Sequence, residues 1–325
     1  MSTAAESAAM AAEQMPADEA TAPPPWRRIL NRLLHTKTAV IAGGFIVLLF
    51  ALAIIAPLLE PFNPQTQFFR VTHLLSPQTG QIVDTKVSLK NLGPGHHHWL
   101  GTDYEGRDIL SRLISGLRTT LEIAALVIAL SVAAAIPLGL VAGYFGRWID
   151  AVISRFADAF FAFPPLMLAL AVAVLAGRSI IAISGGIAIV FVPGFVRIVR
   201  AQVLAIREET FITASRSIGV GDTRILLRHV LPNVAPPLVV QAAIGFGYAV
   251  TAAAGLGALG FGPPNAVTWG DMLNTAYSHL ASATWPIAPP GVAITLVVLA
   301  FNLMADCLRD AFSREVFVTA GGLVS

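Results

Sequence analysis

The chain has 325 residues, of which 55% are hydrophobic and only 12% are charged, and its mean hydropathy is +0.72. This composition lies outside the range of soluble globular proteins and predicts an integral membrane protein. The formal net charge of +2 is too small to indicate nucleic-acid binding, and the lone Cys307 excludes an internal disulfide.

The two ends of the chain differ from its middle. Residues 1–25 are rich in Ala, Glu and Pro and contain no basic residue, so we predict a disordered cytoplasmic tail rather than a signal peptide. Residues 26–37 place apolar side chains at helical spacing with arginines between them, which predicts a short interfacial helix; an ordinary basic flank of the first span is the alternative. Residues 38–314 then form the transmembrane domain, and residues 315–325 form a second cytoplasmic tail.

Stretches free of Asp, Glu, Lys and Arg are long enough to hold helices of roughly 20 residues that cross a bilayer. They predict six transmembrane helices, at about 38–59, 119–143, 155–176, 179–199, 234–258 and 287–306. One broken helix over residues 159–196 is a less favourable interpretation, because Gly177-Arg178-Ser179 puts a charge and a helix breaker at its middle. The predicted fold class is therefore an all-α membrane protein.

The basic residues predict the orientation. With the N-terminus inside, most of the 21 Lys and Arg residues fall in cytoplasmic segments, so both termini are expected in the cytoplasm. Residues 60–118 then form one long outer loop. In this loop Ile109, Leu110, Leu113 and Leu117 share one helical face, which predicts a short helix leading into the second span.

A charged segment, residues 207–233, lies within a predicted cytoplasmic loop of residues 200–233. Phe211, Ala214 and Ile218 follow i, i+3, i+7 spacing and predict a helix over residues 208–218. Gly219-Val220-Gly221 ends that helix, Asp222 is placed to cap a second one, and Pro232 is expected to stop it. Two short helices at an angle suit docking to a soluble partner; a solvated amphipathic loop without a partner is the alternative.

Two patterns of chemistry carry less weight. Gly219-Val220-Gly221-Asp222 matches the Gly-x-Gly-Asp element of intramembrane aspartyl proteases, but Asp222 lies among arginines and the chain contains no Tyr-Asp pair. Adjacent histidines at 96–98 cannot easily turn three rings to one metal ion, so no metal site is predicted.

The intramembrane charges argue against a proton-coupled carrier. Arg155 and Asp158 are spaced to pair locally, and no chain of buried acids indicates a proton-coupled carrier. None of the three lysines belongs to a phosphate-binding loop, so any ATP hydrolysis must be performed by another polypeptide. A self-sufficient secondary carrier remains the alternative from another functional class.

From about residue 35 to 314 the chain resembles the permease subunits of bacterial ATP-binding-cassette importers for dipeptides, oligopeptides and nickel. Ala214-Ser215 and Gly219 look like the Ala-Ala-x-x-x-Gly core of the family's cytoplasmic loop, and Ile225 to Asn233 looks like its closing Ile…His-x-Leu-Pro-Asn. The family's glutamate before the paired alanines is Thr213 here.

Three further stretches are similar to the second, C-type subunit of the peptide and nickel branch. They are His98-Trp99-Leu100-Gly101-Thr102-Asp103 with Gly106-Arg107-Asp108 and Ser111-Arg112, then Leu259-Gly260-Phe261-Gly262 with Trp269-Gly270, and Phe301-Asn302 through Asp310. The usual Glu-Ala-Ser-Leu-Ser-Phe is replaced by residues 253–258, a smaller and apolar version.

This resemblance implies a six-helix type I ABC importer permease in the bacterial cytoplasmic membrane, paired with a homologous B-type permease, two ATPases and an extracytoplasmic solute-binding protein. It implies that the chain binds no cofactor itself and that partner subunits use ATP and Mg²⁺. The expected ATPase-coupling residues are Glu208, Glu209, Phe211, Thr213, Ala214, Ser215, Ile218, Gly219, Arg228, His229 and Pro232.

The outer loop supplies a second candidate site. Asp103, Arg107, Asp108 and Arg112 are hypothesised to hold the gate or the binding protein; a structural salt-bridge cluster that braces the second span is the equal alternative. Dipeptide, longer peptide, nickel chelate and glutathione all remain open as the transported solute.

Overall fold

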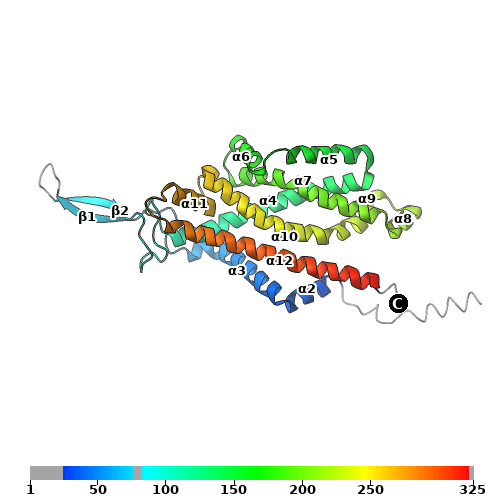
Figure 1. Cartoon of the computed structure of the whole chain (residues 1–325), viewed down its shortest axis with the longest axis horizontal. Helices are drawn as coiled ribbons and strands as arrows, with labels where there is room; N and C mark the ends of the chain where they lie inside the picture. The colour runs from blue at the N-terminus through cyan, green and yellow to red at the C-terminus, as the bar shows by residue number, and fades with distance from the viewer. Residues whose placement is uncertain (1–24, 76–81, 322–325) are drawn as a thin grey trace, which may run out of the picture.

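The computed structural model describes residues 25–75 and 82–321 as an elongated bundle of helices, with a β-hairpin at one end and short helices at the other (Figure 1). In chain order the long helices are α2 (Pro25–His35), α3 (Lys37–Leu59), α4 (Ile109–Phe145), α5 (Arg147–Phe161), α6 (Pro165–Ala176), α7 (Ile180–Arg207), α10 (Leu231–Leu256) and α12 (Ala288–Gly321). Shorter elements between them are α8 (Thr210–Ser217), α9 (Asp222–Ile225), η2 (Leu226–Val230), η3 (Gly257–Phe261), α11 (Trp269–Ser278) and η4 (Trp285–Ile287).

Five of the described helices are long and apolar enough to cross a membrane, and the bent pair α5 and α6 can form a sixth span. This confirms the prediction of a helical membrane protein. The segment predicted as one span at 155–176 is instead two helices that meet at 92°. Pro164 and Pro165 explain the bend, because neither can donate a backbone hydrogen bond across the junction.

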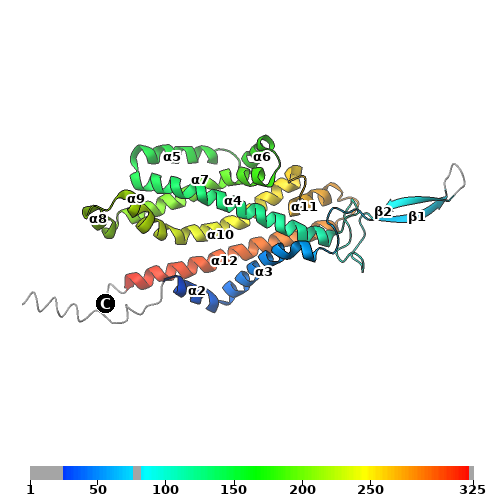
Figure 2. The same cartoon turned by 180° about the vertical axis from the view of Figure 1, so that it is seen from behind.

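The hairpin was not predicted. Strands β1 (Phe69–Leu75) and β2 (Ile82–Ser88) pair antiparallel, with Phe69 opposite Ser88 and Leu75 opposite Ile82. Both figures show this hairpin extending along the long axis, away from the helices (Figures 1 and 2). We call this the hairpin end of the molecule, and the opposite end, which carries α8 and α9, the α8 end.

Three helices, α4, α7 and α12, extend beyond the spans predicted for them, and α7 runs to Arg207, into the predicted cytoplasmic loop of residues 200–233. The short helix expected before residue 119 is wrong as a separate element, because α4 runs without a break from Ile109 to Phe145. Asp108 starts it by accepting a hydrogen bond from the Ser111 amide at 2.8 Å. Helix α12 continues to Gly321, past residue 315 where a tail was expected. The tail predicted for residues 1–25 lies almost wholly outside the described residues.

Helices α4 and α7 pack closely because glycines remove the side chains between them. A Cβ atom added to Gly139 would lie 2.5 Å from the Val199 Cβ, and one added to Gly143 would lie 2.7 Å from the Val203 Cβ. Small residues of this kind allow transmembrane helices to approach. The buried apolar residues form two clusters, one toward each end of the bundle, and the partly buried Ile128 and Phe191 pack against both.

Candidate functional site

At the α8 end, helix α8 is held by one apolar face and open on the other. Ile212 is fully buried within an apolar cluster that includes residues of α4 and α7, whereas Phe211 is 44% exposed and Ile218 is 81% exposed. Phe211, Ala214 and Ile218 therefore share an outward face, as the spacing predicted. We call the exposed Phe211, Ala214 and Ile218 the α8 face.

The turn after α8 depends on Gly219. This residue has φ of +81°, a left-handed conformation that favours glycine, and its amide donates to the Arg216 carbonyl at 2.9 Å. Helix α8 itself begins at Thr210, two residues later than predicted. Glu209 precedes it, and Glu208 pairs with Arg207 at 2.9 Å.

Beyond the turn, two predictions about the second helix are wrong. The residue that precedes α9 is Gly221 rather than Asp222, and the Asp222 carboxylate instead accepts a hydrogen bond from the Tyr144 hydroxyl at 2.6 Å. Pro232 does not stop the helix, because α9 and η2 continue into α10. Pro232 lies in the first turn of α10, where a missing N–H is tolerated, after a wide π-helical turn over Leu226–Val230.

The remaining predicted coupling residues surround the α8 face. Arg228 is exposed, and His229 is half-buried with its ring centroid 6.3 Å from that of Phe211. Thr213 is exposed, and its carbonyl accepts the Ser217 hydroxyl at 3.0 Å. Ser215 is half-buried and donates to the Phe211 carbonyl at 2.8 Å. The structure therefore brings these residues together on one end of the molecule.

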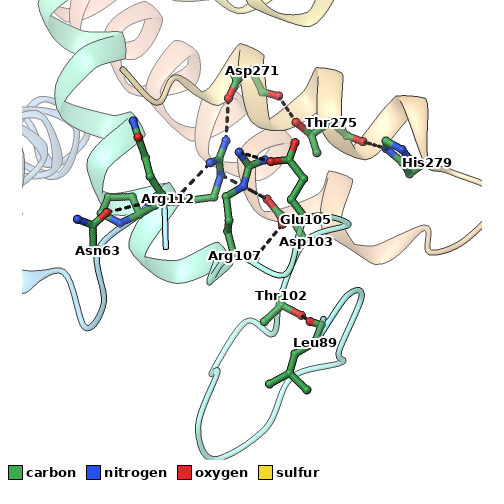
Figure 3. A network of polar contacts seen from close by, with 12 residues as sticks. Asn63, Leu89, Thr102, Asp103, Glu105, Arg107, Arg112, Asp271, Thr275 and His279 are labelled. Atoms are coloured by element: carbon green, nitrogen blue, oxygen red, sulfur yellow. Dashed lines mark hydrogen bonds and ion pairs between the residues drawn. The ribbon is translucent and has the colours of Figure 1, made fainter. Parts of the chain in front are cut away.

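At the hairpin end, three of the four predicted loop residues, Asp103, Arg107 and Arg112, form a polar network in which Asp103 and Arg112 are buried and Arg107 is half-buried (Figure 3). Asp103 accepts the Arg107 guanidinium at 2.8 Å and lies 3.6 Å from that of Arg112. Arg112 is only 1% exposed, and it donates to Asp271 of α11 at 2.7 Å. Paired charges of this kind avoid the large cost of a lone buried ion.

Asp108 makes a separate set of contacts beside this network. It is 1% exposed, its carboxylate caps α4, and it lies 2.8 Å from the His98 ring. His98 packs edge-on against Phe68. The contacts seen in the structure are thus those of the bracing alternative: they hold α4, α11 and the loop together, and Asp108 and Arg112 have almost no surface for another protein to touch.

Sequence reasoning missed several residues. Asp271, His98 and Tyr144 each complete a polar contact with a predicted residue. The local pair expected between Arg155 and Asp158 is also wrong, because Asp158 pairs with Arg197 of α7. A tyrosine within an apolar helix was the available signal, since a buried hydroxyl requires a partner.

Comparisons with known proteins agree with this architecture. Residues 135–318 match the family described as binding-protein-dependent transport system inner membrane component, and residues 24–77 match the N-terminal transmembrane domain of oligopeptide transport permease C. The chain is 39% identical over 302 residues to a dipeptide transport system permease protein, DppC, of Alkalihalophilus pseudofirmus, and the match covers 93% of each chain.

Two other similarities come from a second relative and from a solved structure. The chain is 37% identical to a glutathione transport system permease protein, GsiD, of Pectobacterium atrosepticum, over 90% of this chain and 92% of that one. A chain of the inward-facing MetNI methionine ABC transporter is similar in fold, with a TM-score of 0.52 and 20% identity over 62% of this chain and 97% of that chain.

Proposed function

The chain belongs to the family of binding-protein-dependent transport system inner membrane components, and from this membership we propose that it forms one half of a peptide-conducting pore. It is a multi-pass inner-membrane permease of an ATP-driven importer, and a partner ATPase hydrolyses the ATP. The other half of the pore is a homologous B-type permease, and an extracytoplasmic solute-binding protein delivers the solute. This chain binds no cofactor; ATP and Mg²⁺ are used by the two ATPase subunits.

The α8 face is the observation that carries the proposal for coupling. An 81% exposed Ile218 and a 44% exposed Phe211 lie beside a small Ala214, on a helix whose other face is fixed by Ile212. An exposed apolar patch rimmed by polar residues is typical of a protein-binding surface. We place this face in a cleft of the ATPase, which puts the α8 end in the cytoplasm and the hairpin end outside.

The proposed mechanism follows from that placement. When ATP draws the two ATPases together, they move α8, and the bundle changes from inward-facing to outward-facing access. Such a shift requires that the ATPase bind the two states with different affinity. The peptide substrate rests on the named relatives, which are dipeptide and glutathione permeases.

The test is Ala214→Asp in the co-expressed transporter. A charge on the α8 face is expected to abolish co-purification of the ATPase and transport, while the permease remains in the membrane at wild-type yield. Thr223→Asp, an exposed position on α9, is the matched control with the same new charge. Retention of the ATPase by Ala214→Asp, with transport intact, contradicts the docking assignment.

A further inference from the structure

The hydroxyl of Tyr144 lies where three segments of the chain meet. Tyr144 is at the end of α4 and is only 6% exposed, with its ring in the apolar core of the α8 end. The hydroxyl donates to the Asp222 carboxylate at 2.6 Å, and the Arg216 Nε donates to the same hydroxyl at 3.4 Å. The Arg216 guanidinium also lies over the Tyr144 ring, 4.9 Å from its centroid.

The two partners of Tyr144 lie on opposite sides of the Gly219 turn. Arg216 is in the last turn of α8, and Asp222 is the first residue of α9. Gly219 and Gly221 of the turn are exposed, and a Cβ atom added to either would meet nothing within 4 Å, whereas Val220 between them packs against the apolar core. Tyr144 therefore provides a second connection between α8 and α9, and this connection passes through α4.

We propose that Tyr144 is a positioning residue that transmits movement of α8 to α4 through its hydrogen bonds to Asp222 and Arg216. A hydrogen bond to an ionised group is stronger and more directional than one between neutral groups. It can therefore hold a helix end in one orientation while apolar contacts, such as those of Ile212 and Ile225, permit sliding. The apolar contact of Val220 in the turn permits sliding in the same way, so the polar contact sets how α8 and α9 move relative to α4.

This inference rests on the proposed function, because it assumes that an ATPase moves α8. It goes further in naming the residue that passes the movement to a helix whose other end carries Arg112 of the polar network. A merely structural tyrosine would affect yield or stability. A transmitting tyrosine affects the communication between the two ends of an otherwise intact complex.

The experiment uses the complete purified transporter in proteoliposomes. Stimulation of ATP hydrolysis by the cognate binding protein, added with the ligand it carries on purification, reports communication without requiring the identity of the solute. Tyr144→Phe keeps the ring and removes the hydroxyl. We expect the variant to retain its ATPase and its basal hydrolysis, and to lose about tenfold in stimulation, the factor typical of one charge-assisted hydrogen bond.

A double-variant cycle and a control complete the design. Asp222→Asn removes the charge of the acceptor and is expected to reduce stimulation as well. The double variant is expected to be no worse than Tyr144→Phe alone, because that variant already removes the hydrogen bonds to both Asp222 and Arg216. Tyr248→Phe removes an exposed phenol on α10 and is expected to change nothing. Additive losses in the double variant, or full stimulation in Tyr144→Phe, overturn the inference.

The outcomes separate this inference from the proposed function. If Ala214→Asp strips the ATPase but Tyr144→Phe behaves as wild type, only the inference fails. If Ala214→Asp keeps both the ATPase and transport, or the binding protein stimulates no hydrolysis even with the wild-type chain, the proposed function fails and the inference with it.

Discussion

The two ends of the bundle use charged side chains in opposite ways. At the hairpin end, Asp108 and Arg112 are each 1% exposed, and their partners are other residues of the same chain. At the α8 end, the arginines beside the 81% exposed Ile218 are largely exposed. The charges of the hairpin end are thus paired within the chain, whereas those of the α8 end surround an apolar surface that a partner can cover.

The largest expected effect concerns the hairpin end. Arg112→Met removes the cation that Asp103 and Asp271 share, but Asp103 keeps Arg107 and Asp271 is partly exposed, so we expect a loss of about 3 kcal/mol, the low end of the cost of breaking a buried pair. The thermal midpoint of the purified permease in detergent measures it. Arg118→Met, on an exposed part of α4, is the control and should stay within about 0.5 kcal/mol. Equal stability of the two variants would show that the buried Arg112 pairing does not stabilise the hairpin end.

The next effect concerns the contact between α4 and α7. In Gly139→Ala the new methyl group would lie 2.5 Å from the Val199 Cβ, so α4 and α7 must separate, at a cost of roughly 1–3 kcal/mol. Gly194→Ala in α7 is matched to it, because nothing lies within 4 Å of the added Cβ. There we expect a gain of about 0.5–1 kcal/mol from the lower entropy of the unfolded chain. Chemical denaturation in detergent distinguishes the two.

A smaller loss is expected at the cap of α4. His98→Ala removes the ring that contacts Asp108 and leaves that buried carboxylate with fewer partners, at about 1–3 kcal/mol. His97→Ala alters an exposed neighbour and should be neutral. Thermal unfolding of both variants decides whether His98 belongs to the network or only to the loop.

The smallest effect on stability is expected on the α8 face. Ile218→Ala should leave the free energy of unfolding within about 0.5 kcal/mol of wild type while weakening ATPase binding roughly tenfold. Ile212→Ala, the same substitution on the buried face of α8, should cost about 2–5 kcal/mol of stability. A stability loss at Ile218 equal to that at Ile212 would show that the two faces are not different.

The sequence predicted those parts of the fold that depend on local composition. Apolar stretches located α3 and α10 within a few residues, because burial in lipid requires a continuous run of apolar side chains. The same criterion shortened α4, α7 and α12, because a hydropathy pattern detects only the apolar portion of a helix and misses its charged continuation. The hairpin left a readable signal: two runs rich in β-branched residues, separated by a segment with Pro77 and Gly80.

The candidate sites also differ in how far the sequence could predict them. The spacing of Phe211, Ala214 and Ile218 placed them on one face, because all three lie in α8 or directly after it. Arg112 and Asp271 are separated by 159 positions in the chain, and Tyr144 and Asp222 by 78. No periodicity connects such distant residues, so these contacts become visible only when the helices are packed.

The length of helix α4 matters for how its two ends are connected. Its 37 residues span about 55 Å, whereas the hydrocarbon layer is only about 30 Å thick. A single piece of backbone therefore reaches both aqueous faces and carries Arg112 near one end and Tyr144 at the other. The helix is interrupted at Pro137, where the backbone hydrogen bond that a non-proline residue would donate is missing and the helix can bend. A movement of one end of α4 can therefore reach the other end through the helix itself, without passing between helices. How much of the movement arrives depends on how easily α4 bends at Pro137.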